Sequence, residues 1–325
     1  MLRIIAAAAL AIFGAAGSTS AQDAAANYPN RAIHIVVPFP AGGPADLVAR
    51  IIGQKMSEDW GQPVIIDNRP GGNTVIGAVQ VAKAAPDGYT LLMAIDSTLV
   101  MNQFVYKTLP YDPLTDFAPI TSTTRTISVL AVRAADGPKN VKELIARAKA
   151  APGKLNYGAG TITSQLMGYR FHKAAGIDIL YVPFKGTPAT VNGLLTKSVD
   201  LIYAANVIVN PLIESGQLRA LAKMDGRPAP AAADLPSLAD AAGLSKLENM
   251  SIWLGLVAPK DTPRAIVLKL QKKVVEVLAD PVVAERSGRT GAYSMTSSPE
   301  EFAAFIRQEA ARWEPILRET NIKFD

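Results

Sequence analysis

Short apolar runs alternate with longer amphipathic segments along most of the chain. Short β-branched runs predict strands, and apolar positions three to four residues apart predict helices. In the first third of the chain the predicted order is strand 33–37, helix 45–56, strand 64–66, helix 75–81 and strand 89–94. This order is typical of βαβ units with a mostly parallel sheet.

The alternation begins again at residue 128 and predicts a second α/β half. Its predicted strands cover 128–134, 155–157, 179–184, 199–203 and 218–222, and its predicted helices cover 141–150, 163–175 and 188–196. The segment 226–235 is rich in Pro and Ala and is interpreted as a loop. A last strand at 253–257 and two helices follow. We therefore expect two α/β domains, with a ligand cleft between them at the carboxyl ends of the strands.

Cap signals mark where the last two helices begin. Thr262 followed by Pro263 predicts a helix with Thr as its N-cap and Pro as its first residue. Ser298 with Glu301 three residues later predicts a capping box, in which each side chain accepts a hydrogen bond from the backbone of the other residue.

The first residues are typical of a secretory signal peptide. Arg3 precedes an apolar run at 4–16, and small residues follow up to Ala21, which predicts cleavage before Gln22. The alternative is an N-terminal membrane anchor, but a bilayer span needs roughly 20 apolar residues. We therefore expect an exported, periplasmic protein.

Composition narrows the function classes. The chain has no cysteine and two histidines, which excludes disulfide scaffolds, thiolate metal sites and cysteine nucleophiles. His34 is interpreted as a packed or edge residue of the first strand, and His172 as a surface residue of a helix. The net charge of +5 is spread along the chain without a long basic run, so nucleic acid is not an expected partner.

Catalytic and nucleotide-binding motifs are incomplete. Gly158 and Gly160 begin a dinucleotide motif, but Thr163 stands where the third Gly is needed. Gly72 and Gly77 have the spacing of a phosphate-binding loop, but Ala78 replaces the required Lys. These failures favour a protein that binds a ligand without chemistry, metal or cofactor. A lyase with Lys185 as its base is the enzymatic alternative.

Two Gly-rich loops, at 38–46 and 157–165, each join a strand to a helix. Glycines let backbone N–H groups approach a ligand, and a helix N-terminus attracts a carboxylate. Thr161, Thr163 and Ser164 add hydroxyl donors to the second loop. Asp46 either contacts the ligand or stabilises the first turn of its helix. Two such loops, one in each half, predict a carboxylate site.

The chain also resembles a known family, the extracytoplasmic solute receptors of tripartite tricarboxylate transporters, often called Bug receptors. The resemblance runs from about residue 28 to the C-terminus, and it is carried by the segments 28–29, 38–46, 64–72, 86–91, 109–113, 116–120, 148–155, 183–189, 217–222 and 253–256. Each segment is commonplace alone, but together their order and spacing are specific.

The resemblance implies a two-domain type II periplasmic-binding-protein fold with a two-strand hinge. Domain 1 would comprise residues 22–126 and 249–325, and domain 2 residues 127–248. The protein would be a monomer that captures a small carboxylate in its cleft and passes it to a membrane permease. The implied ligand-binding residues are Phe39, Ala41, Gly42, Asp46, Ser97, Thr98, Gly160, Thr161, Ser164, Phe184, Lys185 and Asn206.

Two departures from the family pattern bear on the ligand. Residues 204–206 lack the acid often found there, which disfavours an amino-acid ligand, and residues 71–75 differ from the usual Gly-rich form. We expect a mono- or dicarboxylate, or an aromatic one if the rings of Phe39 and Phe184 stack on it rather than only pack in the cleft. The alternative function is a receptor that signals to a sensor kinase.

Overall fold

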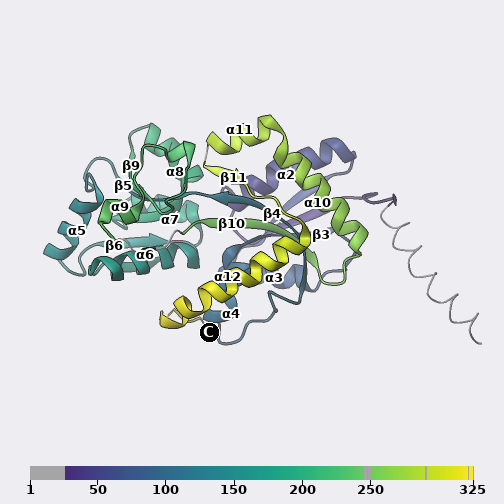
Figure 1. Cartoon of the computed structure of the whole chain (residues 1–325), viewed down its shortest axis with the longest axis horizontal. Coiled ribbons are helices and arrows are strands. Elements are labelled where there is room, and N and C mark those ends of the chain that lie inside the picture. Colours follow the sequence, from purple (N-terminus) through teal and green to yellow (C-terminus); the bar gives the residue numbers. More distant parts are fainter. Residues whose placement is uncertain (1–25, 245–246, 248–249, 290, 321, 325) are drawn as a thin grey trace, which may run out of the picture.

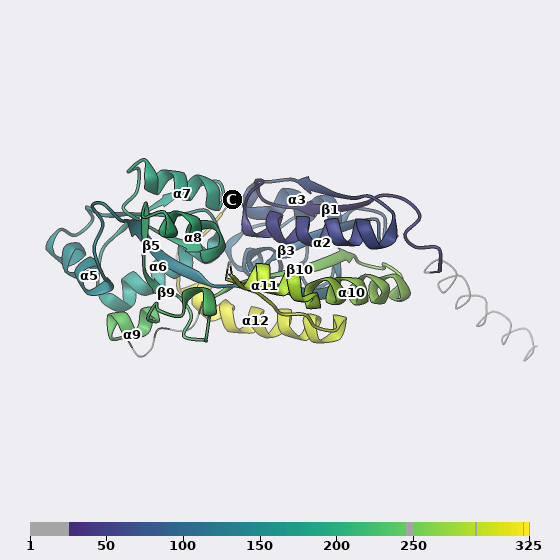
Figure 2. The ribbon, with the colours of Figure 1, turned by 90° about the horizontal axis from the view of Figure 1, so that it is seen from above.

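The computed structural model describes residues 26–325, apart from 245–246, 248–249, 290, 321 and 325. The predicted signal peptide and its cleavage after Ala21 therefore lie outside the described residues. The chain forms two α/β lobes placed end to end along the long axis (Figures 1 and 2). Lobe 1 comprises residues 26–126 and 252–324, and lobe 2 comprises residues 128–251.

Lobe 1 is built on a six-stranded sheet in the order β11-β4-β10-β3-β1-β2. Its strands are β1 (Ile33–Val37), β2 (Val64–Asn68), β3 (Thr90–Ile95), β4 (Phe117–Thr126), β10 (Ile252–Pro259) and β11 (Ala292–Ser294). Its helices are α2 (Pro44–Trp60), α3 (Val75–Ala82), α4 (Asn102–Val105), α10 (Arg264–Ala279), α11 (Pro281–Arg289) and α12 (Pro299–Glu319), with a 3₁₀ turn η1 (Gly72–Thr74) and a π-helical turn η2 (Ser97–Met101).

Lobe 2 is built on a five-stranded sheet in the order β7-β6-β8-β5-β9. Its strands are β5 (Ser128–Arg133), β6 (Asn156–Ala159), β7 (Leu180–Pro183), β8 (Leu201–Ala205) and β9 (Leu218–Lys223). Its helices are α5 (Val141–Ala150), α6 (Ile162–Ala175), α7 (Thr187–Leu195), α8 (Asn206–Glu214) and α9 (Leu238–Ala242), with a 3₁₀ turn η3 (Pro230–Ala232).

The two sheets are mixed, so the prediction of a mostly parallel sheet holds only in part. Strand β1 is parallel to β2 and β3, and β6 is parallel to β7 and β8, as expected for βαβ units. The strands next to the crossings between lobes are antiparallel: β10 to β3 and β4, and β5 to β8 and β9. The reason is that the chain leaves lobe 1 along β4 and returns along β10 in the opposite direction.

A single residue separates the long strand of lobe 1 from the first strand of lobe 2. Ile127 lies between β4 and β5 and is fully buried. Its N–H donates to the Gly291 carbonyl at 3.0 Å, and its carbonyl accepts the Asn206 N–H at 2.7 Å. The second crossing is held where the Met250 N–H donates to the Met224 carbonyl at 3.1 Å. These two crossings are the only places where the described backbone passes between the lobes.

An ion pair spans the lobes beside the first crossing. Arg125 of β4 contacts the carboxylate of Asp225 in lobe 2 with an N–O distance of 3.2 Å. Arg227 also pairs with Asp225, whose side chain is fully buried. Burial alone would raise the pKa of Asp225, but the hydrogen bonds and charge of Arg227, with the charge of Arg125, hold it below the usual range.

The cap predicted for the last helix is confirmed. The Ser298 hydroxyl accepts the Glu301 N–H, and the Glu301 carboxylate accepts the Ser298 N–H at 2.8 Å, which completes the capping box of α12. Helix α12 lies along lobe 1 (Figure 1). Its Phe302 and Trp313 side chains are buried.

Two expectations about single residues are wrong. Helix α10 begins after Pro263, which is itself the N-cap, and the Thr262 hydroxyl donates to an earlier carbonyl instead. His172 is 5% exposed rather than at the surface, and its Nε2 lies 2.9 Å from the Tyr203 hydroxyl. Burial lowers the pKa of His172 to about 3, so the ring is neutral at pH 7.

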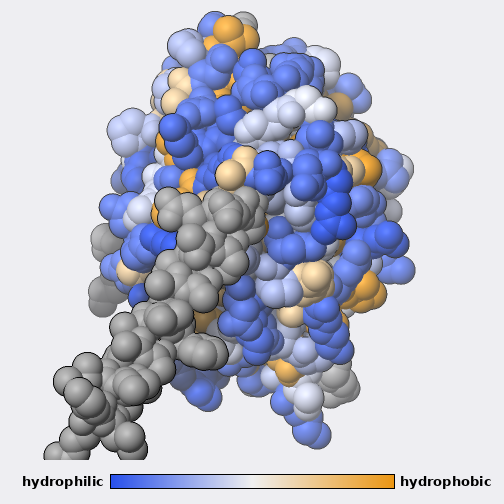
Figure 3. All heavy atoms as spheres, turned by 90° about the vertical axis from the view of Figure 1, so that its right-hand side faces the viewer, coloured by the Kyte–Doolittle hydropathy of each residue, from blue (hydrophilic) through white to orange (hydrophobic). Residues whose placement is uncertain are grey.

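No helix within the described ranges has the length and apolarity to cross a bilayer. The end of lobe 1 that carries α2 and α10 shows mostly polar side chains, with apolar residues scattered singly among them (Figure 3). Such scattering is normal for a surface in contact with water.

The packing of β10 against α12 generates the first prediction. A Cβ atom at Gly255 would lie 2.1 Å from Cζ of the buried Phe302 ring. Gly255→Ala should therefore lower the free energy of unfolding by about 1–3 kcal/mol through overpacking, measured by urea denaturation. The matched control is Gly288→Ala in α11, where a Cβ meets no atom within 4 Å. Equal stability of the two variants would contradict this account of the core.

Candidate ligand-binding site

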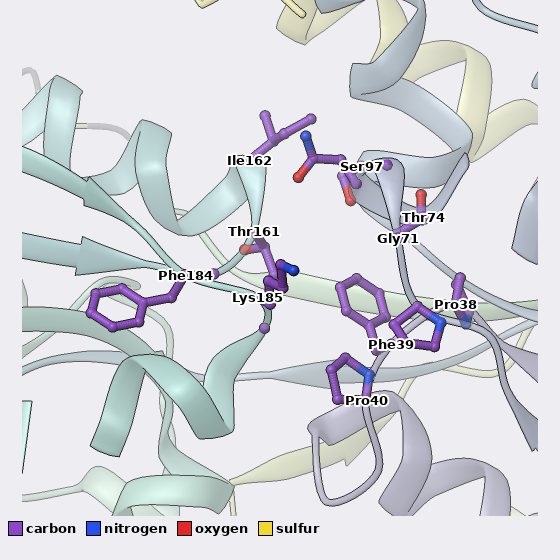
Figure 4. A pocket seen from close by; sticks show the side chains of 15 residues that line it. Pro38, Phe39, Pro40, Gly71, Thr74, Ser97, Thr161, Ile162, Phe184 and Lys185 are labelled. Atoms are coloured by element: carbon purple, nitrogen blue, oxygen red, sulfur yellow. The ribbon is translucent and has the colours of Figure 1, made fainter. Parts of the chain in front are cut away.

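A cavity of about 340 Å³ lies between the lobes. Loops from both lobes line it, and Figure 4 shows those of lobe 1 and lobe 2 on opposite sides. The lining residues are Pro38, Phe39, Pro40, Pro70, Gly71, Gly72, Asn73, Thr74 and Ser97 from lobe 1, and Gly160, Thr161, Ile162, Phe184, Lys185 and Gly186 from lobe 2. The cavity lies at the carboxyl ends of β1, β3 and β6, where ligands of open α/β sheets bind.

The loop between β1 and α2 owes its shape to a buried acid. Asp46 is 2% exposed, and its carboxylate accepts hydrogen bonds from the Gly42 N–H at 2.9 Å, from Arg50 at 3.0 Å and from Asn68 at 3.0 Å. Burial would raise the pKa of Asp46, but these donors lower it below the usual value. Because the Gly42 N–H is engaged by Asp46, it is not available to a ligand in this arrangement.

The loop that leads into α3 has an unusual backbone. Gly71, Gly72, Asn73 and Thr74 have φ values of 133°, 52°, 45° and 83°. Positive φ is costly for residues with a side chain, and such strain persists only where the surroundings hold it. All four residues line the cavity.

A buried polar network holds this strained loop. The Asn102 amide nitrogen donates to the Asn73 carbonyl at 3.0 Å and lies 2.9 Å from the Tyr111 hydroxyl. The Thr98 hydroxyl donates to the Thr74 hydroxyl at 2.9 Å. Asn102 was not predicted from the sequence, and residues 71–75 were noted as unusual but were not among the predicted site residues. The usable signal was the run of Gly, Gly and Asn, the residue types that best tolerate positive φ.

In lobe 2, the loop after β6 ends in a tight helix cap. Thr161 is the N-cap of α6, and its hydroxyl accepts the Ser164 N–H at 3.1 Å. The Ser164 hydroxyl in turn accepts the Thr161 N–H at 3.1 Å and lies 2.9 Å from the Thr161 carbonyl. The Ser164 hydroxyl is therefore used to start the helix, while Gly160, Thr161 and Ile162 face the cavity.

Two glycines allow the lobe 2 loops to come together and meet lobe 1. A Cβ at Gly160 would lie 2.4 Å from the Gly186 carbonyl carbon. A Cβ at Gly186 would lie 3.1 Å from Cδ of Pro40 in lobe 1. The lobes are thus in contact beside the cavity, and we refer to this arrangement as closed.

The two neighbouring side chains of the loop after β7 point in different directions. The Phe184 ring points away from the cavity in Figure 4, into lobe 2, where its atoms occupy the space beside Gly158 and Gly193. Lys185 is exposed at the rim and lines the cavity opposite Phe39, whose ring points inward. The Phe184 ring is therefore a packing element of lobe 2.

Comparison with known proteins identifies the family. A model described as the tripartite tricarboxylate transporter family receptor matches residues 48–322. The chain belongs to this family. Its members are solute-binding receptors of the periplasm, and the predicted resemblance to Bug receptors is confirmed.

Solved structures agree with this assignment. The chain is 34% identical to the periplasmic binding protein BugD, with a TM-score of 0.85 over 91% of this chain and 99% of that one. It is 33% identical to Rpa4515 of R. palustris, solved with adipate, with a TM-score of 0.87 over 90% and 98%. It is 30% identical to MatC of Rhodopseudomonas palustris, solved with malate, with a TM-score of 0.82 over 89% and 100%. The predicted periplasmic-binding-protein fold is confirmed.

The structure brings half of the predicted site residues of this receptor to the cavity. Those that line it are Phe39, Ser97, Gly160, Thr161, Phe184 and Lys185. Those that do not are Ala41, Gly42, Asp46, Thr98, Ser164 and Asn206. Ala41 and Gly42 are exposed on their loop. The other four are buried in hydrogen bonds of the fold, and Asn206 lies beside Ile127 and Gly291 at the first crossing.

The network under the strained loop generates the second prediction. Asn102→Ala removes the donor to the Asn73 carbonyl and should lower the free energy of unfolding of the receptor by about 2 kcal/mol, measured by urea denaturation. The control is Gln103→Ala, at the next position, where the side chain is half-buried and bonds only the Val100 carbonyl one turn back. A loss no greater than that of the control would show that the strained loop does not depend on Asn102.

Proposed function

We propose that this receptor captures a small carboxylate in the cavity between its lobes and delivers it to a membrane permease. Dicarboxylates are our first choice of ligand, because the neighbours Rpa4515 and MatC were solved with adipate and malate. In this proposal the chain is exported on its N-terminal signal, which is removed after Ala21.

One observation carries the choice of an anionic ligand. Among the described residues that line the cavity, Lys185 alone carries a charge. The N-terminus of α6 lies at the same cavity through Thr161 and Ile162, and its dipole adds positive potential. Both features attract a carboxylate and disfavour a cation.

The remaining polar groups at the cavity are neutral. Ser97 is buried and lines the cavity, and its hydroxyl can donate to a ligand oxygen. Backbone groups of the 71–74 and 160–162 loops surround the same space. Once closing removes water, neutral donors hold a carboxylate well, because hydrogen bonds to a charged acceptor are strong.

The capture mechanism follows from the two crossings. The lobes swing about Ile127 and about residues 250–251, and a ligand that contacts loops of both lobes favours the closed population. Lys185, exposed at the rim, acts first by attracting the anion, and the inner groups then hold it.

The third prediction tests the ligand class. A thermal-shift screen of the mature protein should show a rise in Tm with aliphatic dicarboxylates and not with sugars or amines. A ligand at 100 times its Kd adds about 2.7 kcal/mol of stability, which is several degrees for a chain of this size. The same panel includes aromatic and monocarboxylic acids, so that the rise in Tm can be compared between these classes of acid. A response to sugars or amines, with none to carboxylates, would overturn the proposal.

The fourth prediction concerns the rim lysine. Lys185→Met should weaken binding of the best dicarboxylate of the screen about 3- to 30-fold, mainly through slower association, because a rim charge acts on encounter. It should also flatten the salt dependence of the association rate. Stopped-flow and calorimetric titrations at two salt concentrations measure both effects.

Two control variants distinguish a specific contact of Lys185 with the anion from an effect of the protein's overall positive charge. Lys185→Arg should retain most of the affinity, and Lys154→Met, which removes an exposed lysine of lobe 2 outside the cavity, should change neither rate nor salt dependence. If Lys185→Met and Lys154→Met behave alike, Lys185 is not the anion contact.

A further inference from the structure

A buried carboxyl group lies between the two lobes, behind the cavity. Asp96 follows β3 of lobe 1 and is 1% exposed. Its Oδ1 accepts a hydrogen bond from the Thr163 hydroxyl at 2.7 Å and from the Ser97 N–H at 2.6 Å. Thr163 belongs to the first turn of α6, in lobe 2. The Oδ2 atom is buried without a hydrogen-bond partner among the described residues.

The hydrogen bond between Asp96 and Thr163 lies next to the ligand cavity in both lobes. Ser97, next to Asp96, and Ile162, next to Thr163, both line the cavity, and Figure 4 shows them on the opposing loops of the two lobes. Because Thr163 belongs to lobe 2, a movement that draws the lobes apart would break its hydrogen bond to Asp96 and expose the carboxyl to water.

The surroundings of Asp96 in the closed arrangement disfavour its charged form. Burial raises the pKa of Asp96 to about 7, although the hydrogen bonds of Thr163 and Ser97 and the Trp253 N–H act in the opposite direction. Glu309 of α12 adds a further rise. The Glu309 carboxylate is itself held by the indole N–H of Trp253 and by Arg312.

We propose that Asp96 and Thr163 form a contact that couples ligand capture to a proton: the lobes close on an anionic ligand with Asp96 sealed against Thr163, and the Asp96 carboxyl takes up a proton as they close. Asp96 is in this view a positioning residue, since it does not line the cavity. The proposal rests on the proposed carboxylate function only for the choice of probe.

The direction of the pH effect follows from linkage. In the open form the carboxyl contacts water, and its pKa lies near that of an ordinary Asp, about 4. In the closed form it is about 7. The closed form therefore binds the proton more tightly, so acidification from pH 8.5 to pH 6 favours closing. With these two values the Kd of the ligand should fall about tenfold over that range.

The test measures protons directly. Adipate or malate is titrated calorimetrically into the mature protein at pH 6, 7 and 8.5, each in two buffers with different ionisation enthalpies. We expect uptake close to one proton per ligand at pH 6, about half at pH 7 and almost none at pH 8.5. In Asp96→Asn, which cannot titrate, both the uptake and the pH dependence of Kd should disappear. Equal uptake in the two proteins would overturn the proposal.

A second variant should shift the midpoint pH of the effect on Kd without abolishing the effect. Thr163→Val removes the donor that favours the charged carboxyl, so the midpoint of the pH dependence should move upward, and Thr163→Ser should restore it. A purely structural role of Thr163 would lower stability without moving the midpoint. An unmoved midpoint in Thr163→Val would therefore contradict the assigned contact.

A measurement without ligand separates this proposal from the proposed function. Because the chain has no cysteine, spin labels can be placed at Leu47→Cys in α2 and Asn192→Cys in α7, one exposed position in each lobe. The closed fraction of the unliganded protein should increase between pH 8.5 and pH 6, and Asp96→Asn should abolish that increase. If no carboxylate binds but this increase is found, the proposed ligand class fails and the proton coupling stands. If the closed fraction is the same at both pH values, the coupling fails.

Discussion

The pairing of β4 with β10 is the constraint on which the rest of the structure depends. These two strands lead the chain out of lobe 1 and back into it, and they are paired from Ile252 opposite Thr126 to Pro259 opposite Phe117. Strand β10 also pairs with β3, which places Leu254 opposite Ile95. The residues that follow β3 are thereby fixed beside the crossing. The cavity is for this reason built beside the ladder that carries the chain between the lobes.

The two acids near the cavity, Asp46 and Asp96, are placed so that neither strongly repels an anion bound there. An acid close to a carboxylate site would repel the ligand unless its charge were neutralised. Asp46 is neutralised by three donors, one of which is the charged Arg50, and it is turned into its own loop. Asp96 differs, because burial raises its pKa to about 7 and so favours the protonated form. The positive groups are instead weak and distributed: one rim lysine and one helix N-terminus. Among the described residues that line the cavity, no buried cation is present, so a bound anion would be held by Lys185 and by neutral donors.

The sequence predicted the scaffold better than the site, for identifiable reasons. The bounds of β1 and α5 matched their patterns of apolar positions, because β1 is a β-branched run buried on both faces and α5 buries one face with the helical period. The long strand β4 was missed because it carries buried threonines and serines in place of an apolar run. Helix α8 was missed because its valines and isoleucine favour a strand and Pro211 lies inside it. Tertiary contacts override local preference in both segments.

Some predicted site residues lie outside the cavity, and their polar groups have local partners. The residue types of Gly42 and Ser164 suit a carboxylate, but the Gly42 N–H is bound by Asp46 four residues later, and the Ser164 hydroxyl is used in the cap of α6. Local hydrogen bonds of this kind compete with a ligand, and neither the composition nor the spacing of residues predicts them. The residues that do line the cavity include Ser97 and the positive-φ residues Asn73 and Thr74. The 71–75 segment also departs from the usual family pattern. We therefore locate what is specific to this receptor's ligand in the strained loop, and what is general to carboxylates in the start of α6.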